Sequence, residues 1–244
     1  MPRSHAEKLL TSLPKVAGGS RRQQYSASTK RALVEVATVQ FSEHGYGGTS
    51  LDAIVAGARV TKGALYHHFS GKQGVFEAVF AAVEDDASRK IKSALRGATD
   101  PWEKARAGLR EFLEIVQDPV YQRVVIQDGP AILGYERFRE QEERSSYGIV
   151  QDIVGSVLEA STYELDEAMK QTFSRIFFGA MSAAGESVST APDPKAAVAR
   201  IQAAIAFILE GIRSLAEQGI TLSDPAGEAE PAPGRTTRRT NGRS

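Results

Sequence analysis

The spacing of apolar residues is the feature of this 244-residue sequence that most restricts its fold. Apolar side chains recur at intervals of three and four along nearly the whole chain, and no segment shows the alternation expected of a strand. A spacing of three and four puts side chains on one face of an α-helix, whereas a half-buried strand needs a period of two. Three clear stripes run from Leu33 to Phe41, from Val75 to Val83 and from Val198 to Leu215. The sequence therefore predicts an all-α protein.

Capping and stop signals divide this pattern into about nine helices. Starts are indicated by Ser or Thr with an acidic residue or Gln three positions later and by Asp-Pro pairs, and ends by Gly45 and Gly219. The expected helices span residues 28–44, 50–57, 61–68, 71–95, 101–116, 120–128, 130–159, 163–190 and 194–218. Both ends of the chain lack this periodicity, so residues 1–27 and 220–244 are expected to be mobile.

Residues 49–72, TSLDAIVAGARVTKGALYHHFSGK, carry the most informative local pattern. They read as a short helix, a tight turn and a second short helix, which is a helix-turn-helix. Ile54 and Val55 are expected to face inward from the first helix. Leu65 and Phe69 are expected to anchor the second helix, because they are four residues apart. We therefore expect a helix-turn-helix domain at 28–72 and a larger helical domain at 73–219.

The outward residues of the second helix suit the major groove of DNA. Gly63 and Ala64 are small enough to let the backbone approach base edges, and Lys62 can reach a guanine or a phosphate. Tyr66 and His67 can contact phosphate oxygens, which position a protein on DNA without reading sequence. The candidate DNA-binding residues are Thr49, Ser50, Thr61, Lys62, Gly63, Ala64, Tyr66, His67, His68 and Lys72.

The distribution of charge is compatible with this interpretation. The net charge of the chain is zero, but residues 1–72 contain ten Lys or Arg against four Asp or Glu, a net charge of +6. The remainder must therefore carry a net charge of −6. A basic segment attached to an acidic body suits an anionic partner such as DNA. An uneven distribution of solvent-exposed charge, without any binding partner, explains these numbers equally well.

Several other functional classes find no support. The absence of cysteine excludes disulfides and thiolate chemistry. His67 and His68 are adjacent on a helix, point about 100° apart and have no carboxylate at ligand spacing, so no metal site is expected. Gly185–Ser189 begins like a nucleophile elbow but lacks the closing glycine and the preceding strand. We expect no catalytic residue and no cofactor. No apolar run approaches the roughly 20 residues of a membrane span, so we expect no membrane association and a cytoplasmic location.

The pattern around the helix-turn-helix resembles the TetR family of bacterial regulators. The matching residues are Thr49-Ser50, Ile54, Val60-Thr61, the run from Gly63 to Phe69, and Lys72. Val55, Arg59 and Gln73-Gly74 depart from the family pattern. Arg59 replaces the usual turn glycine, and a left-handed backbone there would cost on the order of 1 kcal/mol. The segment from Asp128 to Glu136 also looks familiar from some members, without an assigned role.

The resemblance implies a ligand-responsive transcriptional regulator, a repressor that binds palindromic double-stranded operator DNA as a homodimer and is released by a small molecule. The alternative is a helical dimeric interaction or architectural protein without an inducer. A partly hollow core would hold an apolar or amphipathic effector, although each aromatic residue could equally be ordinary core. The candidate ligand-binding residues are Trp102, Phe112, Tyr121, Tyr135, Phe138, Tyr147, Phe173 and Phe177.

The last two expected helices are the candidate dimer interface. Their apolar stripe is longer than one short helix needs within a single chain, which favours a four-helix contact with a symmetry mate. Small residues on the first of the two would allow close approach either within one chain or across a dimer. The candidate interface residues are Ala180, Ala184, Ile201, Ile205, Ile208 and Ile212.

Overall fold

The computed structural model describes residues 18–161 and 165–220, and all regular structure in these ranges is helical. The elements are α1 (Gly18–Gly48), α2 (Leu51–Gly57), α3 (Lys62–His68), α4 (Lys72–Ala94), α5 (Pro101–Ile115), α6 (Pro119–Tyr121), the π-helical η1 (Gln122–Asp128), α7 (Gly129–Leu133), α8 (Tyr135–Glu142), the π-helical η2 (Glu143–Tyr147), α9 (Gly148–Glu159), α10 (Glu167–Thr190) and α11 (Pro194–Glu217). Because α6–η1–α7 and α8–η2–α9 are continuous in sequence, these elements form nine helical segments in the described ranges. The predicted all-α class and helix number are confirmed.

Two boundaries differ from those expected. Helix α1 begins at Gly18, so residues 18–27 are helical where a mobile extension was expected. Extending a docked helix adds one hydrogen bond per residue without a new nucleation cost, which explains the longer helix. The expected helix 130–159 is interrupted at Gly134, whose φ of 75° is incompatible with a continuous helix. The expected mobility of residues 1–17 and 221–244 concerns segments outside the described residues.

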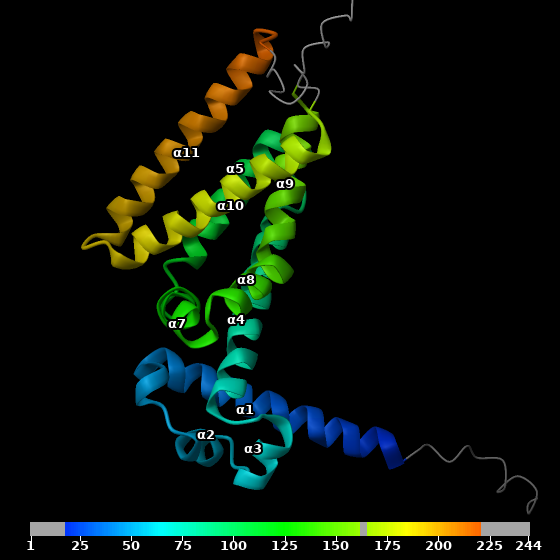
Figure 1. The fold of residues 1–244 in the computed structure, drawn as a ribbon, viewed down its shortest axis with the longest axis vertical. Helices are drawn as coiled ribbons and strands as arrows, with labels where there is room; N and C mark the ends of the chain where they lie inside the picture. The colour runs from blue at the N-terminus through cyan, green and yellow to red at the C-terminus, as the bar shows by residue number, and fades with distance from the viewer. Residues whose placement is uncertain (1–17, 162–164, 221–244) are drawn as a thin grey trace, which may run out of the picture.

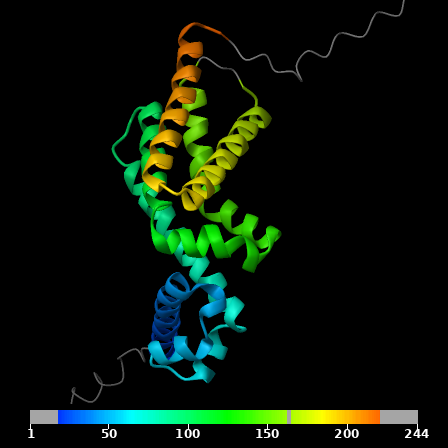
Figure 2. The same ribbon diagram turned by 90° about the vertical axis from the view of Figure 1, so that its left-hand side faces the viewer.

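Helices α1–α3 form a small unit at one end of the molecule, and α4 runs from this unit into the larger helical body (Figure 1). The view turned by 90° shows the same arrangement, with α10 and α11 adjacent on the outside of the body (Figure 2). One core cluster includes Leu33, Ile54, Leu65 and Phe76 of the small unit and its connection to α4. The same cluster contains Val124 of η1. The core therefore continues across the expected domain boundary at residue 72.

Candidate DNA-binding surface and ligand cavity

Local capping and burial position helix α3. Ser50 is the N-cap of α2 and its hydroxyl accepts a hydrogen bond from the Ala53 amide at 3.1 Å. Thr61 caps α3 in the same way, accepting from the Ala64 amide at 3.2 Å. Ile54 and Leu65 are buried between the helices, as the sequence predicted. These contacts hold α3 on the small unit and leave its other face free.

The exposed face of α3 carries most of the candidate DNA-binding residues. Lys62, Gly63, Tyr66 and His67 are exposed. The half-buried candidates are Ala64, His68 and Lys72. Thr49 is the exception, because its side chain is buried and its hydroxyl donates to the carbonyl oxygens of Gln40 and Gly45, each at 2.9 Å. Thr49 therefore holds the end of α1, and its side chain does not lie on this exposed face.

The turn between α2 and α3 has a left-handed residue. Arg59 has a φ of 56° and is the one non-glycine residue with positive φ among those described. A side chain in this region meets the following carbonyl oxygen, which is why glycine is favoured there. The suspicion that this position needs a left-handed backbone is confirmed.

Each of the two lysines on this surface has a partner within the chain. The ammonium of Lys62 lies 2.6 Å from the carboxylate of Asp52 on α2, which raises the pKa of Lys62. The ammonium of Lys72 lies 4.4 Å from the centre of the Tyr46 ring. Burial and the neighbouring charges of His67 and Lys30 lower the pKa of His68. Both effects disfavour the charged form of His68.

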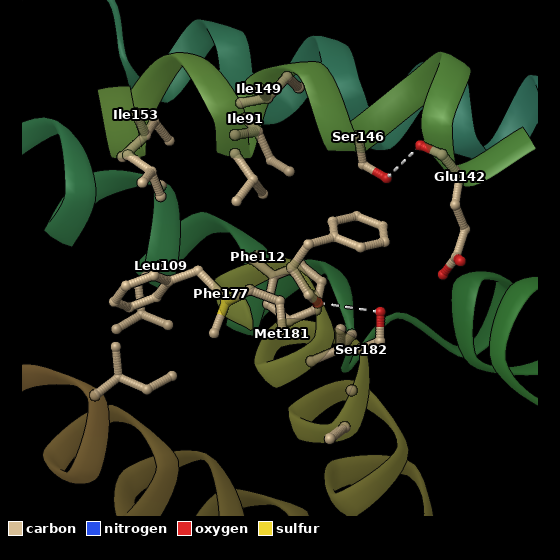
Figure 3. Close-up of a pocket in the computed structure, with 18 of the residues that line it drawn as sticks. Ile91, Leu109, Phe112, Glu142, Ser146, Ile149, Ile153, Phe177, Met181 and Ser182 are labelled. Carbon is tan, nitrogen blue, oxygen red and sulfur yellow. Dashed lines mark hydrogen bonds between the residues drawn. The ribbon is translucent and has the colours of Figure 1, made fainter. Parts of the chain in front are cut away.

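The helical body contains a cavity of about 560 Å³, lined mainly by α5, η1, α9, α10 and α11. Aliphatic side chains form one end, where Leu109 and Ile153 lie, and polar groups from Glu142, Ser146 and Ser182 gather at the other (Figure 3). A volume of this size is typical of sites for small organic molecules. We call the two regions the apolar end and the polar end.

Five of the eight candidate ligand-binding residues line this cavity: Phe112, Tyr121, Phe138, Phe173 and Phe177. The other three lie outside its lining. Trp102 is buried in a cluster with Leu209, behind the cavity wall, Tyr135 is 77% exposed, and Tyr147 packs edge-on against Phe178. Sequence spacing does not distinguish the sides of a helix that has neighbours on several faces.

The polar end contains two carboxyl groups that the sequence analysis missed. Glu84 of α4 is 2% exposed, and its carboxylate accepts hydrogen bonds from Tyr121 at 2.9 Å and Ser145 at 2.5 Å. Burial raises the pKa of Glu84. Burial, together with the charge of Glu84, raises the pKa of Glu142 to about 7. Glu84 follows Phe80 by four residues in the apolar stripe of α4, and a charge in that register was the available signal.

The candidate dimer residues separate into two groups. Ala180 and Ile208 are exposed and Ile201 is half-buried. Ala184 is buried within the chain, and Ile205 and Ile212 line the cavity, so these three do not belong to an exposed face. Phe207 at 81% and Ile176 at 63% are exposed apolar residues that the sequence analysis missed, and Leu215, at the end of the expected stripe, is 44% exposed.

A polar contact joins the larger body to the end of α1. The carboxylate of Asp128 in η1 accepts hydrogen bonds from the Tyr46 amide at 2.8 Å and from Arg123 at 3.2 Å. The Arg123 guanidinium packs so closely on Gly45 that a β-carbon at Gly45 would meet it at 1.8 Å. Asp128 lies in the segment that had no assigned role in the sequence analysis.

No helix within residues 18–161 and 165–220 is long and apolar enough to cross a membrane. In the same part of the chain, no group of three or more His, Asp or Glu residues is arranged to hold a metal ion.

Two family models match the chain. Residues 33–79 match "Bacterial regulatory proteins, tetR family", and residues 102–212 match "Tetracyclin repressor-like, C-terminal domain". The chain belongs to the TetR family of bacterial transcriptional regulators. The predicted function, a helix-turn-helix transcriptional regulator, is confirmed at this level. The family is not known for enzymatic activity, which agrees with the lack of a catalytic motif in the sequence.

Individual relatives extend this comparison. The Transposon Tn10 TetC protein of Escherichia coli is 29% identical over 142 residues, which is 57% of this chain and 71% of TetC. Other curated relatives are matched over 36% to 60% of their own lengths. The structure of a TetR-family regulator from Pectobacterium atrosepticum is 28% identical, with a TM-score of 0.67 over 78% of this chain and 96% of that one. AibR, solved with isovaleryl coenzyme A and operator DNA, shares the fold at 20% identity and a TM-score of 0.53 over 74% of this chain and 97% of that one.

Proposed function

We propose that this TetR-family chain is a ligand-responsive repressor that binds a palindromic operator as a homodimer, in the cytoplasm, where the DNA lies. The observation that carries the proposal is the combination of an exposed α3 face with a cavity of about 560 Å³ in the same chain. AibR, a relative in fold, was solved with both a small molecule and operator DNA, which supports the same pair of ligands here.

The proposed DNA contacts come from α3 and the two helix starts beside it. Gly63 and Ala64 would lie against base edges, with Lys62 released from Asp52 to reach a guanine or phosphate. Tyr66 and His67 would contact phosphates. The complete proposed set is Ser50, Thr61, Lys62, Gly63, Ala64, Tyr66, His67, His68 and Lys72, and Thr49 acts from behind by holding the end of α1.

The proposed dimer forms through the outer faces of α10 and α11. Phe207 and Ile208 expose more apolar surface than a helix in water normally leaves uncovered, and Ile176 and Leu215 extend the same kind of surface. A symmetric dimer covers such a surface with an identical copy. It would also bring two α3 helices to two half-sites about one turn of DNA apart.

Helix α4 is the proposed connection between the two ligands. It begins beside the DNA-binding surface at Lys72 and reaches the cavity through Glu84 and Ile91. An effector would release DNA only by binding better to the conformation in which the two α3 helices no longer match the groove spacing. A ligand with equal affinity for both conformations would shift nothing.

Operator binding tests the proposal directly. A duplex selected from a random library should be palindromic, and its affinity should fall steeply as salt is raised. Lys62→Ala and Tyr66→Ala should each weaken binding by about 1 to 3 kcal/mol in a fluorescence titration. Tyr135→Ala is the matched control, since Tyr135 is 77% exposed on α8. Unchanged affinity in both α3 variants would exclude this surface.

A further inference from the structure

We infer that the cavity selects hydrophobic organic cations, such as a bulky aromatic amine or onium ion, over neutral and anionic molecules of the same shape. The inference rests on the proposed function in taking this cavity as the effector site, and it adds the charge class of the effector. It depends on the charge and the aromatic surface of the lining.

The charged residues that line the cavity are all acidic. Its charged residues are Glu84, Glu142 and Glu186, and no Lys, Arg or His is among the described residues that line it. Neither Glu84 nor Glu142 forms an ion pair with a residue in the described ranges. Buried carboxylates in proteins are normally paired with a cation, because burial without one is costly. An occupant with a positive charge would provide that partner.

The groups around Glu84 and Glu142 leave the role of cationic partner to the ligand. Glu84 is held by the hydroxyls of Tyr121, Ser145 and Ser146, which are neutral groups. Glu142 faces the hydroxyl of Ser182, and the charge of Glu84 disfavours its ionised form.

The basic residue whose charge acts on Glu142 is Arg139, about one turn earlier on α8. Its guanidinium lies 3.8 Å from Glu143, and Arg139 does not line the cavity. The charge of Arg139 favours ionisation of Glu142, and the charge of Glu143 opposes it. The pKa of Glu142 nevertheless lies at about 7, so Arg139 does not take the place of a cation inside the cavity.

The rest of the lining favours a cation independently of the carboxyl groups. Aromatic rings of Phe112, Phe138, Phe173, Phe177 and Phe178 line the cavity together with aliphatic side chains. The face of an aromatic ring carries partial negative charge and attracts a cation within about 6 Å. The cavity exists whether or not its carboxyl groups are charged. Its volume and apolar surface therefore account for affinity, and its carboxyl groups account for selectivity.

Three phenyl-substituted probes separate the possibilities, two tetraphenyl ions of equal size and a neutral triphenyl compound that is one ring smaller. Tetraphenylphosphonium and tetraphenylborate share size and shape and differ in the sign of their charge. Triphenylphosphine oxide is neutral and is a strong hydrogen-bond acceptor, so it would be preferred if the carboxyl groups acted as protonated donors. Binding to the full chain should be measured by calorimetry at pH 8, where Glu142 is mostly ionised, given its pKa of about 7.

We expect the phosphonium to bind at least about tenfold more tightly than the other two probes. Glu142→Gln should weaken phosphonium binding by about tenfold, because it removes charge and keeps shape. Glu140→Gln is the control: Glu140 is exposed on the same helix, outside the cavity, and its variant should bind like the parent. If Glu84→Gln folds, it should act in the same direction as Glu142→Gln.

Three results would overturn the inference: equal or tighter binding of the borate or the oxide, no binding of any probe, or unchanged phosphonium affinity in Glu142→Gln. Each can be told apart from failure of the proposed function, because operator binding by the same preparation is measured separately. A chain that binds operator and prefers the borate loses this inference alone. A chain that prefers the phosphonium and binds no duplex keeps the inference and loses the repressor proposal.

Discussion

The ammonium of Lys62 and the carboxylate of Asp52 lie 2.6 Å apart on the surface proposed to meet DNA, with both side chains mostly exposed. The pair joins the start of α3 to the first turn of α2. It neutralises a positive charge at the point where a phosphate would bind. Contact with DNA therefore requires Lys62 to exchange one anion for another.

Removing this competitor should strengthen DNA binding. In Asp52→Asn, Lys62 is free and one negative charge is lost near the phosphates, so operator affinity should rise about fivefold at low salt. The slope of log affinity against log salt concentration should become steeper by about one. Titrations at several salt concentrations measure both. Asp86→Asn is the matched control, because Asp86 pairs with Lys90 at 3.0 Å on α4. An Asp52→Asn variant that binds like the Asp86→Asn variant would contradict a role for Lys62.

Relieving the left-handed strain at Arg59 should stabilise the protein. Arg59→Gly should raise the free energy of unfolding by about 0.5 to 1 kcal/mol, since the strain exceeds the extra flexibility of an unfolded glycine. Urea denaturation measures the change. Arg59→Ala removes the same charge and keeps the strain, so it should not stabilise. Equal stabilisation by both would show that charge, and not backbone strain, is responsible.

Asp128 should be important for stability at the junction of η1 and α1. In Asp128→Ala, the amide of Tyr46 and the guanidinium of Arg123 lose their shared acceptor, so the free energy of unfolding should fall by about 1 to 3 kcal/mol. Asp128→Asn keeps one acceptor oxygen and should cost less. Chemical denaturation compares the two variants, and an alanine variant as stable as the parent would mean that water replaces the carboxylate without loss.

Phe207 should be needed for dimerisation and not for folding. Its side chain is 81% exposed, so Phe207→Glu should leave the melting temperature of the single chain largely unchanged while giving a monomer that binds operator at least about 100-fold more weakly. Light scattering gives the mass. Gln202→Glu adds the same charge at another exposed position of α11 and should remain dimeric. A Phe207→Glu protein with the mass of a dimer would move the interface elsewhere.

Glu142 should make the protein less stable as the pH rises. Its folded pKa of about 7 lies above the value of about 4.3 for an unfolded glutamate, so the folded state binds more protons in that interval. Its contribution to stability is therefore complete below about pH 4 and is lost as the pH rises through about 7.

Thermal unfolding at pH 5 and pH 8 measures this loss. Glu142→Gln should reduce it by on the order of 1 kcal/mol, less than the full shift because the carboxyl is partly exposed and screened. Some loss should persist in this variant, since the pKa of Glu84 is raised in the same direction. The Glu140→Gln control should keep the parental loss, and an unchanged loss in Glu142→Gln would contradict the assignment.

Features that depend on residues close together in sequence were predictable. Helical periodicity, the Asp100-Pro101 helix start and the break of α1 at the non-helical Gly45 involve groups within one or two turns, so the sequence alone indicated about nine helices and the inward side of the helix-turn-helix. The left-handed turn at Arg59 is of the same kind. The need for a left-handed backbone at this position follows from the geometry of a tight turn, whichever helices surround it.

Features that depend on contacts between distant segments were decided by the tertiary structure. Thr49 was a candidate for DNA contact, but its side chain is buried and donates its hydroxyl to carbonyl oxygens at the end of α1. Ile205 and Ile208 belong to one apolar stripe, yet Ile205 lines the cavity and Ile208 is 50% exposed, because α5 and α10 cover only one side of α11. The sequence by itself determined the all-α class, most of the helical segments and which face of α3 is exposed. The packing of those helices determined where the cavity lies and that it encloses two carboxyl groups, since burial is a property of the assembled neighbours.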